Sequence, residues 1–214
     1  RPEHIILRTN FFEDVLLGFE LVKSFLSDEE ADYIRNFTQV DLTPPEDDLD
    51  FGVRTRWARK RAAYLCCLYR AGFQPPTGYR IRFQGNNVLD AMVRSDGSIR
   101  PSEGITFQQA VNWFSTVWDN YHSEYFHAYQ ESHDGREWAD EDLKALLVFL
   151  TRKRVPGGNA YVSGYRKLTG VIGLHTVASE KPFHRSILER VRGGGAVIVD
   201  LSRGDSGVGR SFAE

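Results

Sequence analysis

The amino-acid sequence predicts a mainly α-helical fold with a short β element and one C-terminal strand. Most of the 214 residues lie in stretches where apolar side chains recur at three- and four-residue steps, the spacing of one helix face. Capping patterns and breakers such as Gly72 and Pro156-Gly157-Gly158 separate these stretches. Four Trp, nine Tyr and fourteen Phe supply bulk for an aromatic core. We therefore expect about five to seven packed helices.

Three helices are predicted in the first third of the chain. The first covers 11–25, and a capping-box pattern at Ser27 and Glu30 predicts a second that runs to about Gln39. A third is expected over 55–71, where the adjacent thiols of the only two cysteines pack in the core of a protein from a reducing compartment. These cysteines are Cys66 and Cys67.

The middle of the chain predicts the β element and the longest helix. Apolar and polar residues alternate over 79–84, which is typical of a half-buried strand, and Gly104 marks a turn of a small hairpin. Thr106 and Gln109 form a second capping box, at the start of a helix of about six turns. The apolar stripe of that helix consists of Phe107, Val111, Phe114, Trp118, Tyr121, Tyr125 and Ala128.

Three further helices and a strand are predicted in the last third. Asp140 opens a helix whose last turn carries the cations of 152–154, where they suit the helix dipole. Shorter helices are expected near 164–172 and 182–192, and a buried strand over 196–201. We assign residues 1–178 to a helical domain and 179–214 to the edge of a second domain.

Composition and charge narrow the classes of function. The formal net charge of −2 argues against wholesale attraction to nucleic acid, although a local basic face is compatible with it. No apolar run approaches the roughly 20 residues of a membrane span, so we predict a cytoplasmic protein with no membrane partner. The histidines have no metal-binding spacing, and we predict no metal site. The serines form no nucleophile elbow, and we predict no catalytic residue.

The C-terminal tail indicates that the chain is a piece of a larger protein. Gly193-Gly194-Gly195 precedes a β-branched run that closes in Asp200-Leu201-Ser202, the pattern of a buried parallel strand. Such a strand needs neighbours that this chain does not supply. Residues 204–211 also fit a phosphate-binding loop except for Arg210, which replaces its lysine. Arginine does not simply replace that lysine, and we interpret this match as accidental.

The tail resembles the core segment of HerA/FtsK-type P-loop ATPases, in which an apolar-Asp-Leu-Ser strand leads into a helix. The resemblance covers about 35 residues from Ser179, including Lys181-Pro182-Phe183. It implies a RecA-like core that binds ATP and Mg²⁺ in the full-length protein, assembles as a ring and acts on DNA. Four residues are implied to lie near a nucleotide: Asp200 and Ser202 at the strand end, and Arg203 and Arg210 toward a neighbouring subunit's nucleotide.

A basic cluster on the third predicted helix is the candidate DNA contact. It consists of Arg54, Arg56, Arg59, Lys60 and Arg61. Such a face can hold phosphates with a salt-dependent affinity. Alternatively, the cluster balances the acidic residues just before it, which are Glu46, Asp47, Asp48 and Asp50, or those of neighbouring subunits.

Two functions follow from the sequence. In the first, the chain is part of an ATP-driven DNA translocase or helicase. Its helical domain is inserted into a motor core, and the chain is inactive on its own. The second is a non-catalytic helical module that binds a protein partner. A phosphate-loop motif upstream of Arg1 and an acidic strand end downstream of Glu214 would favour the motor.

Overall fold

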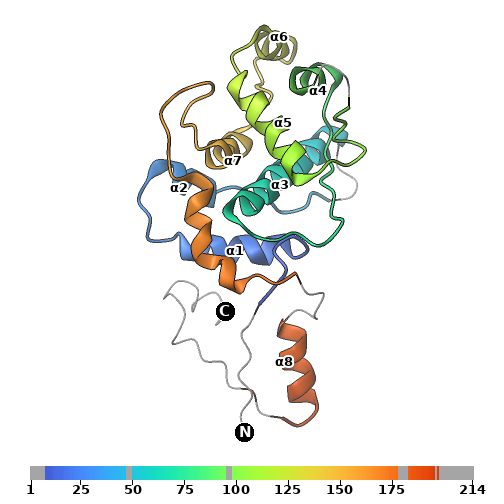
Figure 1. Ribbon diagram of the computed structural model, residues 1–214, viewed down its shortest axis with the longest axis vertical. Helices are drawn as coiled ribbons and strands as arrows, with labels where there is room; N and C mark the ends of the chain where they lie inside the picture. Colours follow the sequence, from blue (N-terminus) through green and yellow to red (C-terminus); the bar gives the residue numbers. More distant parts are fainter. Residues whose placement is uncertain (1–7, 47–49, 95–97, 178–182, 196, 198–214) are drawn as a thin grey trace.

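A computed structural model describes residues 8–46, 50–94, 98–177, 183–195 and 197 of the chain. These residues form a helical body with no β-sheet, which confirms the mainly α fold class (Figure 1). The helices are more numerous than we predicted. In order they are α1 (Val15–Phe25), α2 (Asp32–Thr38), α3 (Phe51–Ala71), α4 (Asn87–Val93), α5 (Phe107–Asp119), α6 (Glu124–Ser132), α7 (Glu141–Thr151), the 3-10 helix η1 (Gly164–Leu174) and α8 (Phe183–Arg192).

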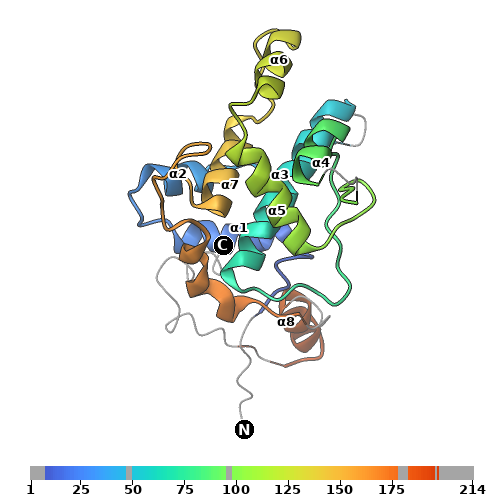
Figure 2. The same cartoon turned by 45° about the horizontal axis from the view of Figure 1, so that its top comes forward.

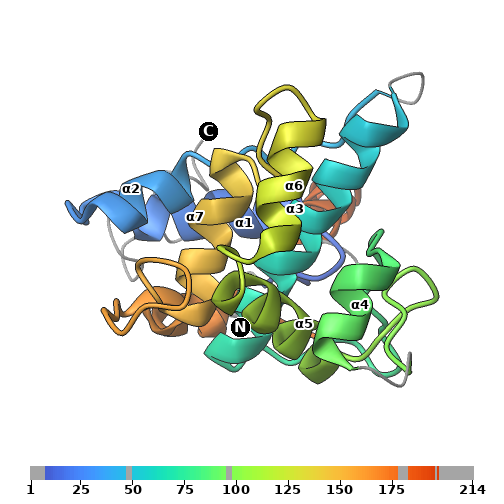
Figure 3. The same ribbon diagram turned by 90° about the horizontal axis from the view of Figure 1, so that it is seen from above.

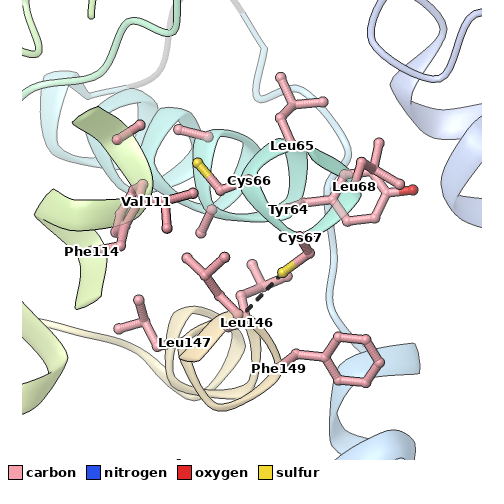
Figure 4. Packing of buried hydrophobic residues seen from close by; sticks show 14 of the residues in the cluster. Tyr64, Leu65, Cys66, Cys67, Leu68, Val111, Phe114, Leu146, Leu147 and Phe149 are labelled. Atoms are coloured by element: carbon pink, nitrogen blue, oxygen red, sulfur yellow. Dashed lines mark hydrogen bonds between the residues drawn. The ribbon is translucent and has the colours of Figure 1, made fainter. Parts of the chain in front are cut away.

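Helix α3 is the centre of the body. It packs against α5, α7 and η1 (Figures 2 and 3), and its residues 62–68 are all buried. Gly72 ends the helix as predicted, with a φ of 102° that the absence of a side chain permits. The thiol of Cys67 faces the Leu146 carbonyl oxygen of α7, 3.8 Å away (Figure 4). Both cysteines are fully buried, as expected, and burial raises the pKa of both thiols.

The caps of α5 and α7 are confirmed, whereas the one predicted for α2 is wrong. Thr106 and Gln109 form the reciprocal box at the start of α5, and the Asp140 side chain accepts the Leu143 N–H at the start of α7. Ser27 caps no helix, because the turn after α1 continues to Glu29 and its hydroxyl bonds Asp28 instead. Helix α2 begins later, without a side-chain cap.

Two further predictions about helices are corrected. The six-turn helix is broken into α5 and α6, because Asn120 bonds back to the Thr116 carbonyl oxygen and Ser123 is extended. The cations after α7 do not occupy its last turn: Arg152 is the left-handed cap, with φ of 65°, and Lys153 pairs with Asp119. Helix η1 matches the predicted 164–172 helix in place, but it is of the 3-10 type.

The predicted hairpin is reduced to a single antiparallel bridge. Ile81 and Ile105 exchange both backbone hydrogen bonds, each 2.9 Å long. The connection between them contains helix α4, which the alternating pattern did not indicate. Helix α8 lies below the body in Figures 1 and 2. The strand predicted over 196–201 lies outside the described residues apart from Val197, and the division at residue 178 stays a prediction.

Candidate nucleic-acid interface

The basic cluster predicted to contact DNA lies on α3, and we call it the α3 basic cluster. Its Arg59 is buried inside the body. Only 9% of the residue is exposed, and its guanidinium lies 4.8 Å from the ring centroid of Trp138. Its Nε donates a hydrogen bond of 2.9 Å to the Gln84 carbonyl oxygen. Burial lowers the pKa of this guanidinium from its ordinary value. Arg59 therefore ties α3 to the chain around Gln84 and does not present its charge to a phosphate, contrary to our expectation.

Lys60 and Arg61 are also held by partners within the chain. The Nζ of Lys60 lies 2.8 Å from the Asp142 carboxylate, an ion pair that joins α3 to α7. Arg61 donates a hydrogen bond of 3.0 Å to the Tyr79 hydroxyl. Both side chains are half-buried. Replacing these residues together with Arg59 would remove three contacts between elements of the fold, so such a variant would report on stability as well as on DNA.

Arg54 and Arg56 lie nearer to solvent, at the start of α3. Arg54 is exposed but has an interaction partner, and Arg56 is half-buried. Arg56 lines a cavity of about 380 Å³, and Glu46 and Asp140 line it as well. Acidic groups thus face this end of the cluster, which favours the alternative that the cluster balances them. Asp47 and Asp48 lie outside the described residues. DNA contact by Arg54 and Arg56 stays a prediction.

The acidic side of this cavity is set by a turn before α3. Asp41 accepts hydrogen bonds from Thr43, which lower the pKa of its carboxyl group, and Lys60 lowers it further by charge attraction. Trp57 donates from its Nε1 to the Leu42 carbonyl oxygen at 2.9 Å. These bonds hold the turn against α3 and keep a carboxylate beside the basic residues.

The four residues implied to lie near a nucleotide cannot be placed. Asp200, Ser202, Arg203 and Arg210 lie outside the described residues, and their roles stay predictions. In the part of the chain that the structure describes, no group of three or more His, Cys, Asp or Glu side chains could hold a metal ion. In the same part, no helix is both long and apolar enough to cross a membrane.

A second group of exposed basic residues lies outside α3. Arg80 and Arg82 are exposed on the extended segment before α4, and Arg100 is exposed beyond it. The alternation over 79–84 predicted a strand, whereas the DNA contact was predicted at the α3 basic cluster because of its dense positive charge. The alternation itself was the usable signal, because it places both arginines on the solvent side of a half-buried strand.

Comparisons with protein-family models, with curated proteins and with solved structures found no match to this chain.

Proposed function

We propose that this chain is the helical insertion, with an adjoining core strand, of an ATP-driven DNA translocase or helicase of the HerA/FtsK type. The observation that carries the proposal is the sequence of 193–214: a glycine cluster, a β-branched run and Asp200-Leu201-Ser202. In the full-length protein, a RecA-like core would bind ATP and Mg²⁺, and subunits would assemble as a ring around DNA. The helical body would be a non-catalytic part of that motor.

The two ends of the helical body support an insertion. Thr9 and His175 form a parallel bridge, in which the Thr9 N–H donates to the Leu174 carbonyl oxygen at 2.9 Å. The Thr176 N–H donates in turn to the Thr9 carbonyl oxygen at 3.1 Å. A domain inserted into another needs neighbouring ends, because the host chain continues from both of them. The body between Thr9 and His175 meets this requirement.

The His175 side chain fixes this junction. Its Nδ1 accepts the Phe11 N–H at 3.3 Å, and its Nε2 lies 2.8 Å from the Gln74 carbonyl oxygen, to which the neutral ring donates. The rings of Phe11, Phe12 and Phe73 surround it, with centroids 5.5–5.7 Å away. Desolvation lowers the pKa of His175, so the fold favours the neutral ring that can accept at Nδ1. Both ends of the body are therefore held to the segment after α3.

ATP turnover tests this proposal directly. The purified 214-residue chain should show no ATP hydrolysis above a buffer blank, with or without DNA, because it has no phosphate-loop lysine and no acidic strand end. The full-length product of the same gene should hydrolyse ATP, and its reading frame should contain G-x-x-x-x-G-K-[ST] before Arg1. Turnover by the chain alone, or a full-length frame without that motif, would contradict the motor.

A protein-binding module is the second candidate, and helix α8 favours it. Leu188 and Val191 are about half exposed, at 48% and 53%, on a helix whose other residues are mainly charged or polar. Exposed apolar residues on an amphipathic helix are typical of a protein contact. A stop codon shortly after Glu214, together with an absence of ATPase motifs upstream, would favour this module over the motor.

A further inference from the structure

Arg80 and Arg82 lie beside Gly104, and Arg100 lines the same cavity as Gly104; we call this surface the Gly104 patch. A Cβ atom placed on Gly104 would lie 3.0 Å from the Arg82 Nε and 3.4 Å from the Arg80 Cβ. Arg80 and Arg100 line a cavity of about 350 Å³ together with Gly104 and Gln109. All three arginines are exposed. Exposed arginines from two separate segments therefore lie near one glycine: Arg82 and Arg80 beside it, and Arg100 on the cavity that it lines.

The backbone under the Gly104 patch is held in place by the core. Phe83 is buried, with its ring centroid 4.8 Å from those of Trp113 and Phe114 in α5. Ile81 is buried as well and forms the bridge to Ile105. Because successive side chains of an extended segment point to opposite sides, burial of these two residues directs their arginine neighbours outward. The arginines are thus presented by a fixed segment.

Within the part of the chain that the structure describes, Arg80 and Arg82 keep their charge available, because neither has a hydrogen bond or an ion pair from its side chain. Arg100 pairs with Glu103 at 3.1 Å, but both side chains are about two-thirds exposed, so this ion pair is weak. Among the described residues of the patch, the three arginines and Glu103 give a net charge of +2. The arginines of the patch are accessible to solvent, whereas Arg59, Lys60 and Arg61 are not, or are only partly so.

We propose that the Gly104 patch binds the phosphodiester backbone of a nucleic acid. Guanidinium groups match phosphate oxygens in geometry and charge, and they form bidentate hydrogen bonds with them. Arg80 and Arg82 are two residues apart on an extended segment, or roughly 6.6 Å along it, so they can engage separate phosphates of one strand. Contacts of this kind do not depend on base sequence. The inference rests on the proposed function, and it moves the DNA contact from the α3 basic cluster to this patch.

A salt titration of DNA binding tests the inference on the intact 214-residue chain. Fluorescence anisotropy of a labelled 20-base-pair duplex of arbitrary sequence would be measured between 20 and 200 mM KCl. The double variant R80A/R82A should bind about tenfold more weakly at low salt. The slope of log K against log[KCl] should become shallower by about 1.8, or roughly 0.9 for each lost phosphate contact. The variant R80K/R82K should keep the wild-type slope, because lysine retains the charge.

The matched control is R136A/R166A. Arg136 and Arg166 are exposed arginines outside the patch, so this variant removes the same charge. It should bind within about twofold of wild type and keep the slope. Thermal unfolding of both variants should match wild type, because exposed side chains contribute little to stability.

Three results would overturn the inference. They are unchanged binding and slope in R80A/R82A, an equal loss in the R136A/R166A control, and a wild-type chain that binds no duplex at 20 mM KCl. The first two leave the motor proposal intact with its DNA contact elsewhere. The motor itself is judged separately, by ATP turnover of the full-length protein. Binding of inorganic phosphate or anionic vesicles without duplex binding would count as the third result.

Discussion

The α3 basic cluster and the Gly104 patch have similar side chains but differ in their contacts and in their exposure to solvent. In the cluster, Arg59, Lys60 and Arg61 connect α3 to the residues around Gln84, to α7 and to Tyr79. In the patch, Arg80 and Arg82 stand on the solvent side of a segment whose other side is buried. The difference teaches that charge density along the sequence does not measure the charge that a partner can reach. A central helix brings its cations against neighbours, whereas a half-buried strand turns them outward.

The largest effect that would sharpen this contrast is expected from Arg59→Ala. The change removes the contact of the guanidinium with the Trp138 ring and leaves the Gln84 carbonyl oxygen without this donor. We expect a loss of about 2–3 kcal/mol in the free energy of unfolding. Urea denaturation followed by circular dichroism would measure it. A loss below roughly 0.5 kcal/mol would show that Arg59 is effectively a surface residue.

Gly104→Ala should have the next largest effect, and it tests how the patch is built. Gly104 has a φ of 99°, which a residue with a Cβ adopts only at a cost, and that Cβ would press on the Arg82 side chain. We expect a loss of about 1–2 kcal/mol in the free energy of unfolding. Gly135→Ala is the matched control: Gly135 has a φ of 79° but an open site, so only the backbone cost applies. Equal losses in both would mean that Arg82 does not pack against Gly104.

The Lys60–Asp142 ion pair should contribute less. Its side chains are 14% and 30% exposed, which places the pair between a surface and a buried salt bridge. A double-mutant cycle with Lys60→Met and Asp142→Asn should give a coupling energy of about 1 kcal/mol, measured by urea denaturation. The Arg100–Glu103 pair of the patch offers a control cycle, with an expected coupling of roughly 0.3 kcal/mol. A larger coupling energy for Arg100–Glu103 than for Lys60–Asp142 would contradict the view that the cluster, and not the patch, is held by internal contacts.

Arg82→Ala should have the smallest effect on folding. Its side chain is exposed and has no partner among the described residues, so the free energy of unfolding should change by no more than about 0.5 kcal/mol. Differential scanning calorimetry against wild type would measure it. A loss as large as that of Arg59→Ala would assign Arg82 a structural role and remove the distinction between the two regions.

The sequence predicted most helices, but it predicted fewer of the residues at which they begin and end. The Thr106–Gln109 box, the Asp140 cap and the Gly72 stop were readable, because each is a local hydrogen-bonding or backbone preference. The Ser27 cap and the continuous helix through Asn120 were misread. In both cases a local pattern competed with another local bond, and the sequence does not say which is formed.

By itself, the sequence determined the helical class and the burial of Cys66 and Cys67, because each depends on the order of neighbouring residues. Only the tertiary structure decided which cations are accessible. Arg59 is buried because Trp138 and Gln84, distant in the chain, close around it, while Arg80 and Arg82 are exposed because Ile81 and Phe83 enter the core. The tertiary structure also joined Thr9 to His175, 166 positions apart in the sequence (175 − 9), a pairing that no local pattern specifies. Contacts between distant residues depend on the packing of the whole body, and therefore they cannot be inferred from periodicity or capping alone.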